Sequence, residues 1–134
     1  MKLTTEYVLS LQQQIRDERD RKDAELEKLR RDAADAFLDH HQPNVDHIKS
    51  MLVTAMEKNP DATEYKIHLL TMGTEELSTF HPSILQTSIY LRNAYRTRFG
   101  MWFHRNVPAA YLTFETLGNE KYIEVYLIFS LANA

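Results

Sequence analysis

The chain has 134 residues, a formal net charge of -3 at pH 7, 43% hydrophobic residues and 26% charged residues. This length and composition suit one globular domain with a core, and they exclude wholesale disorder. The absence of cysteine excludes disulfides, thiolate zinc sites and a cysteine nucleophile. The glycines are scattered, so the GxxxxGK[ST] and GxGxxG phosphate-binding loops are excluded as well.

Two apolar stretches bear on the location of the protein. The one near the N-terminus is interrupted at Ser10, which makes it too short for the core of a signal peptide. The longest apolar run, residues 125–129, is far below the ~20 residues that a membrane-spanning helix needs. We therefore expect a protein inside the cell or within a macromolecular particle, with no signal peptide and no transmembrane segment.

Residues 5–39 contain neither glycine nor proline and are rich in helix-forming residues, so we predict one long helix that ends before Pro43. At 1.5 Å per residue this helix would be about 50 Å long, more than a small body can cover. An apolar stripe follows it at three- and four-residue spacings, with a longer step past Arg19 and Lys22. The stripe predicts pairing with another helix through Val8, Leu11, Ile15, Leu26 and Leu29. The charges of alternating sign leave open a helix that is merely solvated.

The remaining chain shows helix and strand patterns in turn. We predict helices at residues 43–58 and 82–99, and we interpret Gly100 as the end of the second helix. We predict strands at residues 64–72, 101–105, 110–117 and 121–131, with a turn at Gly118 and Asn119 between the last two. The last strand is apolar on one face and largely apolar on the other, so we expect an interior antiparallel strand with both faces covered.

These elements predict an α+β chain. A coiled-coil-like arm over residues 1–42 would precede a compact body over residues 43–134. In that two-layer body, helices would pack on a mainly antiparallel sheet of three or four strands.

Basic residues are concentrated between Leu77 and Phe114, where four arginines occur without any acidic residue. On a helical wheel, Arg92 falls within the apolar arc of residues 82–99. This position predicts a structural ion pair with a sheet carboxylate, for which Glu124 and Glu115 are candidates. The alternative is an anion-binding site with the sheet as its floor.

The other basic residues of this block alternate with aromatic side chains and predict a surface for an acidic partner. They are Arg96, Arg98, His104 and Arg105. The same residue types bind nucleic acid, where guanidinium groups contact phosphates and rings stack on bases. A further polar cluster at His40, His41 and His47 does not have a standard zinc spacing, so we expect no metal site and no cofactor.

The sequence predicts a non-enzymatic structural or assembly protein. Its N-terminal helix would pair with another copy or with other protein subunits, and its arginine surface would contact an acidic partner. Such a chain fits a small subunit of a large particle, for example a virion. The first alternative is a nucleic-acid-binding module with a helical dimerisation arm, and the second is a small-ligand or enzyme pocket between helix and sheet.

Overall fold

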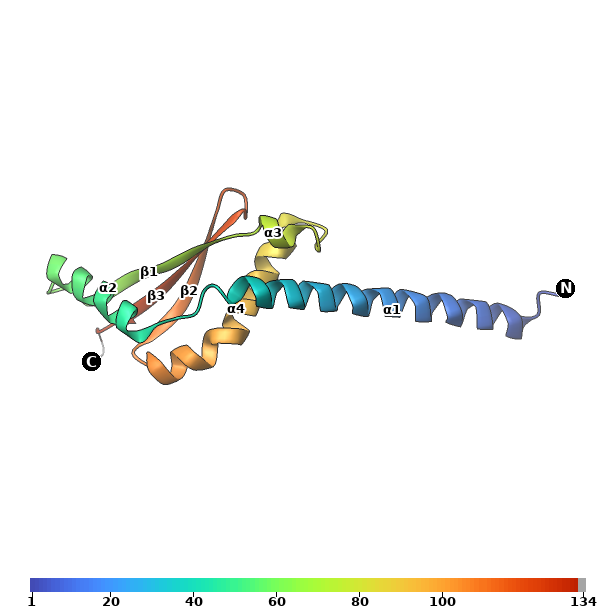
Figure 1. Ribbon diagram of the computed structural model, residues 1–134, viewed down its shortest axis with the longest axis horizontal. Coiled ribbons are helices and arrows are strands. Elements are labelled where there is room, and N and C mark those ends of the chain that lie inside the picture. The colour runs from blue at the N-terminus through green and yellow to red at the C-terminus, as the bar shows by residue number, and fades with distance from the viewer. Residues whose placement is uncertain (133–134) are drawn as a thin grey trace.

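The computed structural model describes residues 1–132. These residues form a projecting helix, here called the arm, and a group of helices and strands, here called the body. The arm is helix α1 (Thr5–Leu38), which extends away from all other elements in Figure 1. The Thr4 hydroxyl caps its first turn by accepting a hydrogen bond from the Tyr7 amide at 3.2 Å. The last turns of α1 belong to the body, because Ala34 and Leu38 are buried in its core. The predicted long helix is confirmed.

The body contains one sheet of three antiparallel strands. These are β1 (Glu64–Gly73), β2 (Ala110–Leu117) and β3 (Tyr122–Ser130), in the order β1-β3-β2. The last strand is therefore the interior strand, as its apolar composition predicted. Because side chains alternate along a strand, the residues of β3 at 123, 125, 127 and 129 share one face, and that face is buried.

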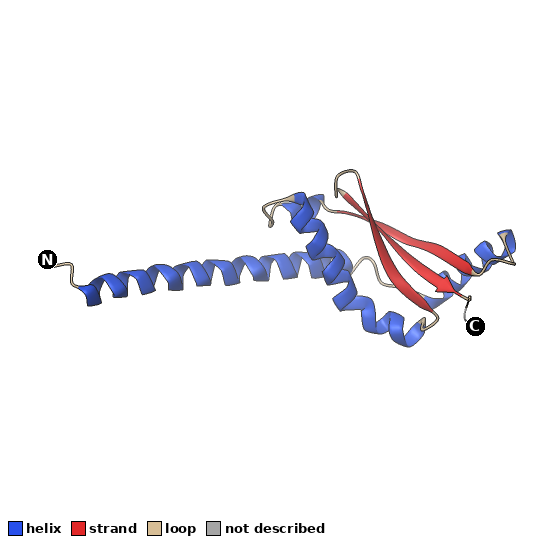
Figure 2. Ribbon diagram, turned by 180° about the vertical axis from the view of Figure 1, so that it is seen from behind, coloured by secondary structure: helices blue, strands red, loops and turns tan. Residues whose placement is uncertain are grey.

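Within residues 1–132, the helices pack on this buried face of the sheet. The main one is α4 (Ile84–Asn106), which runs beside the sheet and crosses the inner end of α1 in Figure 2, while α2 (Val45–Lys58) packs on β1 at the end far from the arm. The short α3 (Glu75–Ser78) lies between β1 and α4 in the chain. Together they give the predicted two-layer α+β architecture. Its core contains Leu91, Tyr95, Phe99 and Phe103 of α4 against Ile67, Ile123, Val125 and Leu127 of the sheet.

The predicted strand at residues 101–105 is wrong, because these residues form the last turns of α4. Gly100 does not end the helix. Tyr95, Phe99 and Phe103 are spaced four residues apart, so continuing the helix places all three rings in the core. The helix ends where Val107 and Pro108 follow Asn106, and the sheet consequently has three strands.

No helix of residues 1–132 lies over the second face of the sheet. The expectation that both faces of β3 are covered is therefore met only in part, because Ile128 on this face is buried while Tyr122 is exposed. Tyr111 is 55% exposed and Tyr122 is 51% exposed on this face. An ion pair between Lys66 and Glu115 crosses it, and the Lys66 ammonium lies 4.3 Å from the centre of the Tyr126 ring. Aromatic rings and charge pairs, rather than a covering helix, therefore account for its apolar residues.

Candidate functional site

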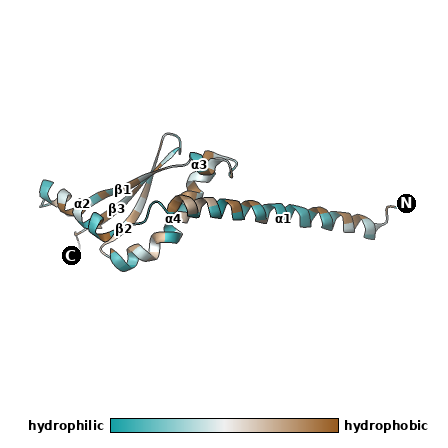
Figure 3. Cartoon of the chain, in the orientation of Figure 1, coloured by the Kyte–Doolittle hydropathy of each residue, from teal (hydrophilic) through white to brown (hydrophobic). Residues whose placement is uncertain are grey.

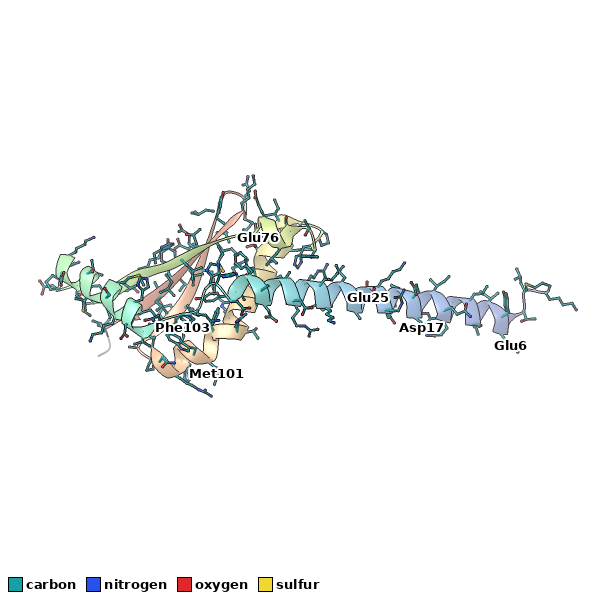
Figure 4. All side chains as sticks on the ribbon, in the orientation of Figure 1. Glu6, Asp17, Glu25, Glu76, Met101 and Phe103 are labelled. Atoms are coloured by element: carbon teal, nitrogen blue, oxygen red, sulfur yellow. The ribbon has the colours of Figure 1, made fainter. Side chains whose placement is uncertain are left out.

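No other element of residues 1–132 lies beside the outer part of α1. Every residue from 5 to 25 is exposed, including Val8 at 48% and Ile15 at 71%. Figure 3 shows brown apolar turns between teal polar ones along this segment, and Figure 4 shows Glu6, Asp17 and Glu25 projecting from it into open space. The outer part of α1 thus carries an apolar stripe that no other element of the described chain covers.

The middle of the arm is supported by its own charged side chains. Arg21 contacts Glu18 at 2.5 Å and Glu25 at 2.8 Å, one turn before and one turn after it. Lys22 also lies 3.8 Å from Glu18. Ion pairs at these spacings stabilise a helix without tertiary packing, so this segment can hold its shape as a projecting rod.

The predicted helix-pairing residues lie on both sides of this charged segment. Val8, Leu11 and Ile15 are exposed near the tip of the arm. Leu26 is half-buried where the body begins, and Leu29 is 52% exposed one turn later. The structure therefore keeps most of the predicted pairing surface accessible.

The base of the arm is fastened to α4 by an arginine that we expected to face a partner. Arg98 donates a hydrogen bond to the Asp35 carbonyl at 2.7 Å and forms an ion pair with Asp39. Arg30 of α1 makes a second contact with the body, because it donates a hydrogen bond to the carbonyl of Phe80, in the segment before α4, at 2.6 Å. Between α1 and α4 runs a groove of about 770 Å³, with Ala34 and Tyr90 among its lining residues. Arg98 thus belongs to the joint between arm and body.

The remaining arginines do not form one surface with it. Each residue advances an α-helix by about 100°, so Arg96 and Arg98, which are two residues apart, point to nearly opposite sides of α4. The Arg96 guanidinium lies 4.7 Å from the centre of the Phe114 ring, on the β2 side. His104 and Arg105 are exposed in the last turn of α4. The basic block of the sequence is distributed around the helix.

The predicted ion pair between Arg92 and Glu124 does not occur among the ion pairs of residues 1–132. Arg92 is half-buried and contacts the Ser88 carbonyl at 3.4 Å within its own helix. Glu124 accepts a hydrogen bond from Tyr126 on the second face of the sheet. Glu115, the other candidate, pairs with Lys66 on that face. Since α4 covers the opposite face, the sheet separates Arg92 from both carboxylates.

Sequence reasoning missed a polar cluster that joins the β2–β3 turn to α4. Glu120 accepts hydrogen bonds from Ser88 at 2.7 Å and from Thr116 at 3.0 Å, and Ser88 is fully buried. Glu120 and the preceding Asn119 both have positive φ, a strained conformation for residues other than glycine. The sequence signal was the Gly118–Asn119 turn, but nothing indicated that the next carboxylate turns inward.

Three of the six histidines lie around a hollow where α2, β1, α4 and the segment between α1 and α2 meet. Its volume is about 340 Å³, and its lining includes His40, His41, His47 and Tyr95. Burial, and then the neighbouring His40, lower the pKa of His41. The described residues 1–132 contain no group of three or more histidine or carboxylate side chains arranged to hold a metal ion. The hollow therefore combines hydrogen-bonding side chains with apolar walls.

Within the part of the chain that the structure describes, none of the helices combines the length and the apolar character needed to cross a bilayer. Comparisons with protein-family models, with curated proteins and with solved structures found no match to this chain.

Proposed function

We propose that the protein is a structural or assembly protein whose arm pairs with the arm of a second copy in antiparallel orientation. One observation carries the proposal: residues 5–25 are all exposed although they carry an apolar stripe. The stripe is long and narrow, which suits a helix better than a globular surface.

The charges within the stripe favour the antiparallel orientation over the parallel one. In a parallel pair each residue faces its own copy, so Lys22 would oppose Lys22 and Arg19 would oppose Arg19 in the middle of the contact. In an antiparallel pair, Arg19 can instead lie opposite Glu18. The apolar stem of Lys22 then covers Ile15 while its ammonium group stays in water.

Placing Arg19 opposite Glu18 fixes how the two helices are aligned. This alignment also brings the apolar residues at the two ends of the stripe together. Val8 lies opposite Leu29, and Leu11 lies opposite Leu26. The overlap extends over roughly 30 Å of helix, with one body at each end. Our wider proposal is that such pairs are building units of a larger particle, for example a virion.

Cysteine cross-linking tests the orientation, because the natural chain has no cysteine. We expect a variant with both Val8→Cys and Leu29→Cys to form a covalent dimer on mild oxidation. Val8→Cys alone should not, since it would cross-link only in a parallel pair. Ala24→Cys is the control, because Ala24 is exposed on the opposite side of the helix from the stripe. Cross-linking of Val8→Cys alone at the level of the double variant would contradict the antiparallel register.

Sedimentation tests the pairing itself. We expect the natural chain to dimerise with increasing concentration and a variant with Leu11→Asp and Ile15→Asp to remain a monomer. These leucine and isoleucine side chains are exposed, so their replacement leaves the core of the body intact. Ala24→Asp introduces a charge on the opposite side and should still dimerise. A natural chain that stays monomeric at high concentration would refute the proposal.

A salt titration separates this proposal from the nucleic-acid alternative. Neutralisation of phosphates by arginine makes the affinity for DNA or RNA fall steeply as salt rises. The distribution of arginines around α4 does not favour such a site, and we expect no binding even at low salt. Salt-dependent binding that Arg96→Ala and Arg105→Ala weaken would support the alternative instead.

A further inference from the structure

We infer that the hollow between α2, β1, α4 and the segment that joins α1 to α2 is a binding site for a small oxyanion, either a carboxylate or a phosphate. This site lies in the body and is separate from the pairing surface of the arm. It is built from groups that are far apart in the chain: the segment between α1 and α2, the first turn of α2, the middle of β1, and Tyr95 of α4.

The first observation is the unsatisfied hydroxyl of Tyr95. This side chain is completely buried, and its Oη has no hydrogen-bond partner among residues 1–132. Leaving a buried hydroxyl unpaired is unfavourable, so native proteins seldom do so without a reason. The rings of Phe99, Phe103 and Phe114 surround the Tyr95 ring and offer no acceptor. Tyr95 is also one of the residues that line the hollow, and a molecule that reaches the floor of the hollow would supply the partner that this buried hydroxyl lacks.

The second observation is the chemical character of the lining. His41 and His47 contribute imidazole groups that make no hydrogen bond of their own within the described residues, and no carboxylate lines the hollow. The N-terminus of α2 lies there as well, where Asn44 caps the His47 amide at 3.0 Å. Helix N-termini and imidazole N–H groups attract negative charge, so this set of donors fits an acceptor-rich anion better than a cation.

The third observation is a bulge in β1 beside the hollow. The register of β1 against β3 shifts between His68 and Leu70, and the two consecutive residues Leu69 and Leu70 both line the hollow. A regular strand would place them on opposite faces. With Ile48 they form an apolar wall, which strengthens hydrogen bonds made inside the site. The volume of about 340 Å³ is suitable for a small ligand.

The charged and titratable groups near His41 set the expected pH dependence. His40 precedes it in the chain, and Glu76 of α3 contributes an opposing negative charge. Because an anion is attracted more strongly to a protonated imidazole, binding should strengthen as the pH falls from about 6.5 through the lowered pKa of His41.

Nuclear magnetic resonance of the histidine rings in the full chain tests the inference. We expect sodium acetate or sodium phosphate to shift the ring signals of His41 and His47 in a saturable manner at pH 6. Sodium chloride at equal ionic strength should not. Saturation with acetate alone would identify a carboxylate site, and saturation with phosphate alone would identify a phosphate site.

Two variants with a matched control make the test specific. Tyr95→Phe should weaken binding by about tenfold, as expected for one hydrogen bond to a charged acceptor. Tyr65→Phe is the control, because the Tyr65 hydroxyl already donates to the Asn59 carbonyl at 2.7 Å. If Tyr95→Phe disturbs the fold, the exposed His47→Ala should still weaken binding. The inference is overturned if neither anion saturates, if chloride reproduces the shifts, or if the folded variants bind as tightly as the natural chain.

Discussion

The outer part of α1 and the helix α4 are both long, yet they are stabilised by different interactions. The outer part of α1 consists largely of strong helix formers, and its ion pairs connect successive turns of the same helix. Helix α4 contains Gly100 and several residues of low helix propensity, including Thr87 and Thr97. It is stable because Leu91, Tyr95, Phe99 and Phe103 pack in the core.

This difference explains how the molecule can expose an apolar stripe. A helix that depends on packing must bury its apolar face, whereas a helix supported by local pairs can keep that face available. The arm is thus suited to bind a second helix, while α4 organises the body. Substitutions should therefore have very different effects in the two regions.

The largest effect should come from truncating a core residue of α4. Leu91 is completely buried, so Leu91→Ala should lower the free energy of unfolding by about 2–5 kcal/mol. The exposed Ile15 is the matched position on the arm, where Ile15→Ala should change it by less than about 0.5 kcal/mol. Denaturant titration at a concentration where the chain is monomeric gives both values. Similar losses at the two positions would contradict the distinction.

A smaller loss is expected at the polar cluster between α4 and the β2–β3 turn. Glu120→Ala removes the acceptor of the buried Ser88 hydroxyl and should lower the free energy of unfolding by about 1–3 kcal/mol. Glu115 is the control carboxylate, since its ion pair with Lys66 is exposed to solvent and Glu115→Ala should cost less than about 1 kcal/mol. Denaturant titration measures both losses. Equal losses would show that the inward carboxylate of Glu120 stabilises the fold no more than the exposed carboxylate of Glu115.

The joint between arm and body should show a smaller effect still. Arg98→Ala removes the contacts to Asp35 and Asp39, which are partly exposed, and should cost about 1 kcal/mol. The exposed Arg105 is the control, and Arg105→Ala should be within about 0.5 kcal/mol of the natural chain. Hydrogen exchange adds a local measurement, because amides near Leu38 should exchange faster in Arg98→Ala only. Unchanged exchange there would argue against a role of Arg98 at the joint.

The contrast between the two helices also explains what could be predicted from the sequence. The arm was predicted along its whole length because its stability is local. The end of α4 was missed because Gly100 was interpreted as a stop signal, whereas the core contacts of Phe103 carry the helix onward to Asn106. The interior position of β3 followed from its apolar composition, which the sheet order confirms.

The side-chain predictions depended on geometry that one element cannot supply. Side chains alternate along β3, so Glu124 lies on the opposite face from Ile123 and Val125. The sequence alone therefore allowed the prediction that Glu124 points away from the helix that covers the apolar face. The contact between Arg98 and Asp39, by contrast, requires knowing how α1 crosses α4. The unpaired hydroxyl of Tyr95 likewise emerges only when several elements surround it.

The smallest effect that we predict concerns the pH dependence of the joint. Burial, and then Arg30, lower the pKa of His81, just as burial and His40 lower the pKa of His41. The Phe37 ring lies 4.9 Å from the His41 ring at the end of α1, and the Tyr90 ring lies 4.9 Å from the His81 ring beside α4. Both histidines therefore belong to the region where the arm joins the body.

The sign of the effect follows from these lowered pKa values. Each imidazole binds protons more readily in the unfolded chain than in the folded one, so stability is complete above the unfolded pKa of about 6.5. This contribution to stability is lost progressively as the pH falls from about 6.5 through the lower pKa that each imidazole has in the folded chain. Thermal unfolding in a buffer without carboxylate or phosphate should show this decline, and His81→Gln should flatten it, whereas the exposed His104→Gln should not. A decline of the same steepness in His81→Gln and the natural chain would exclude a contribution from His81.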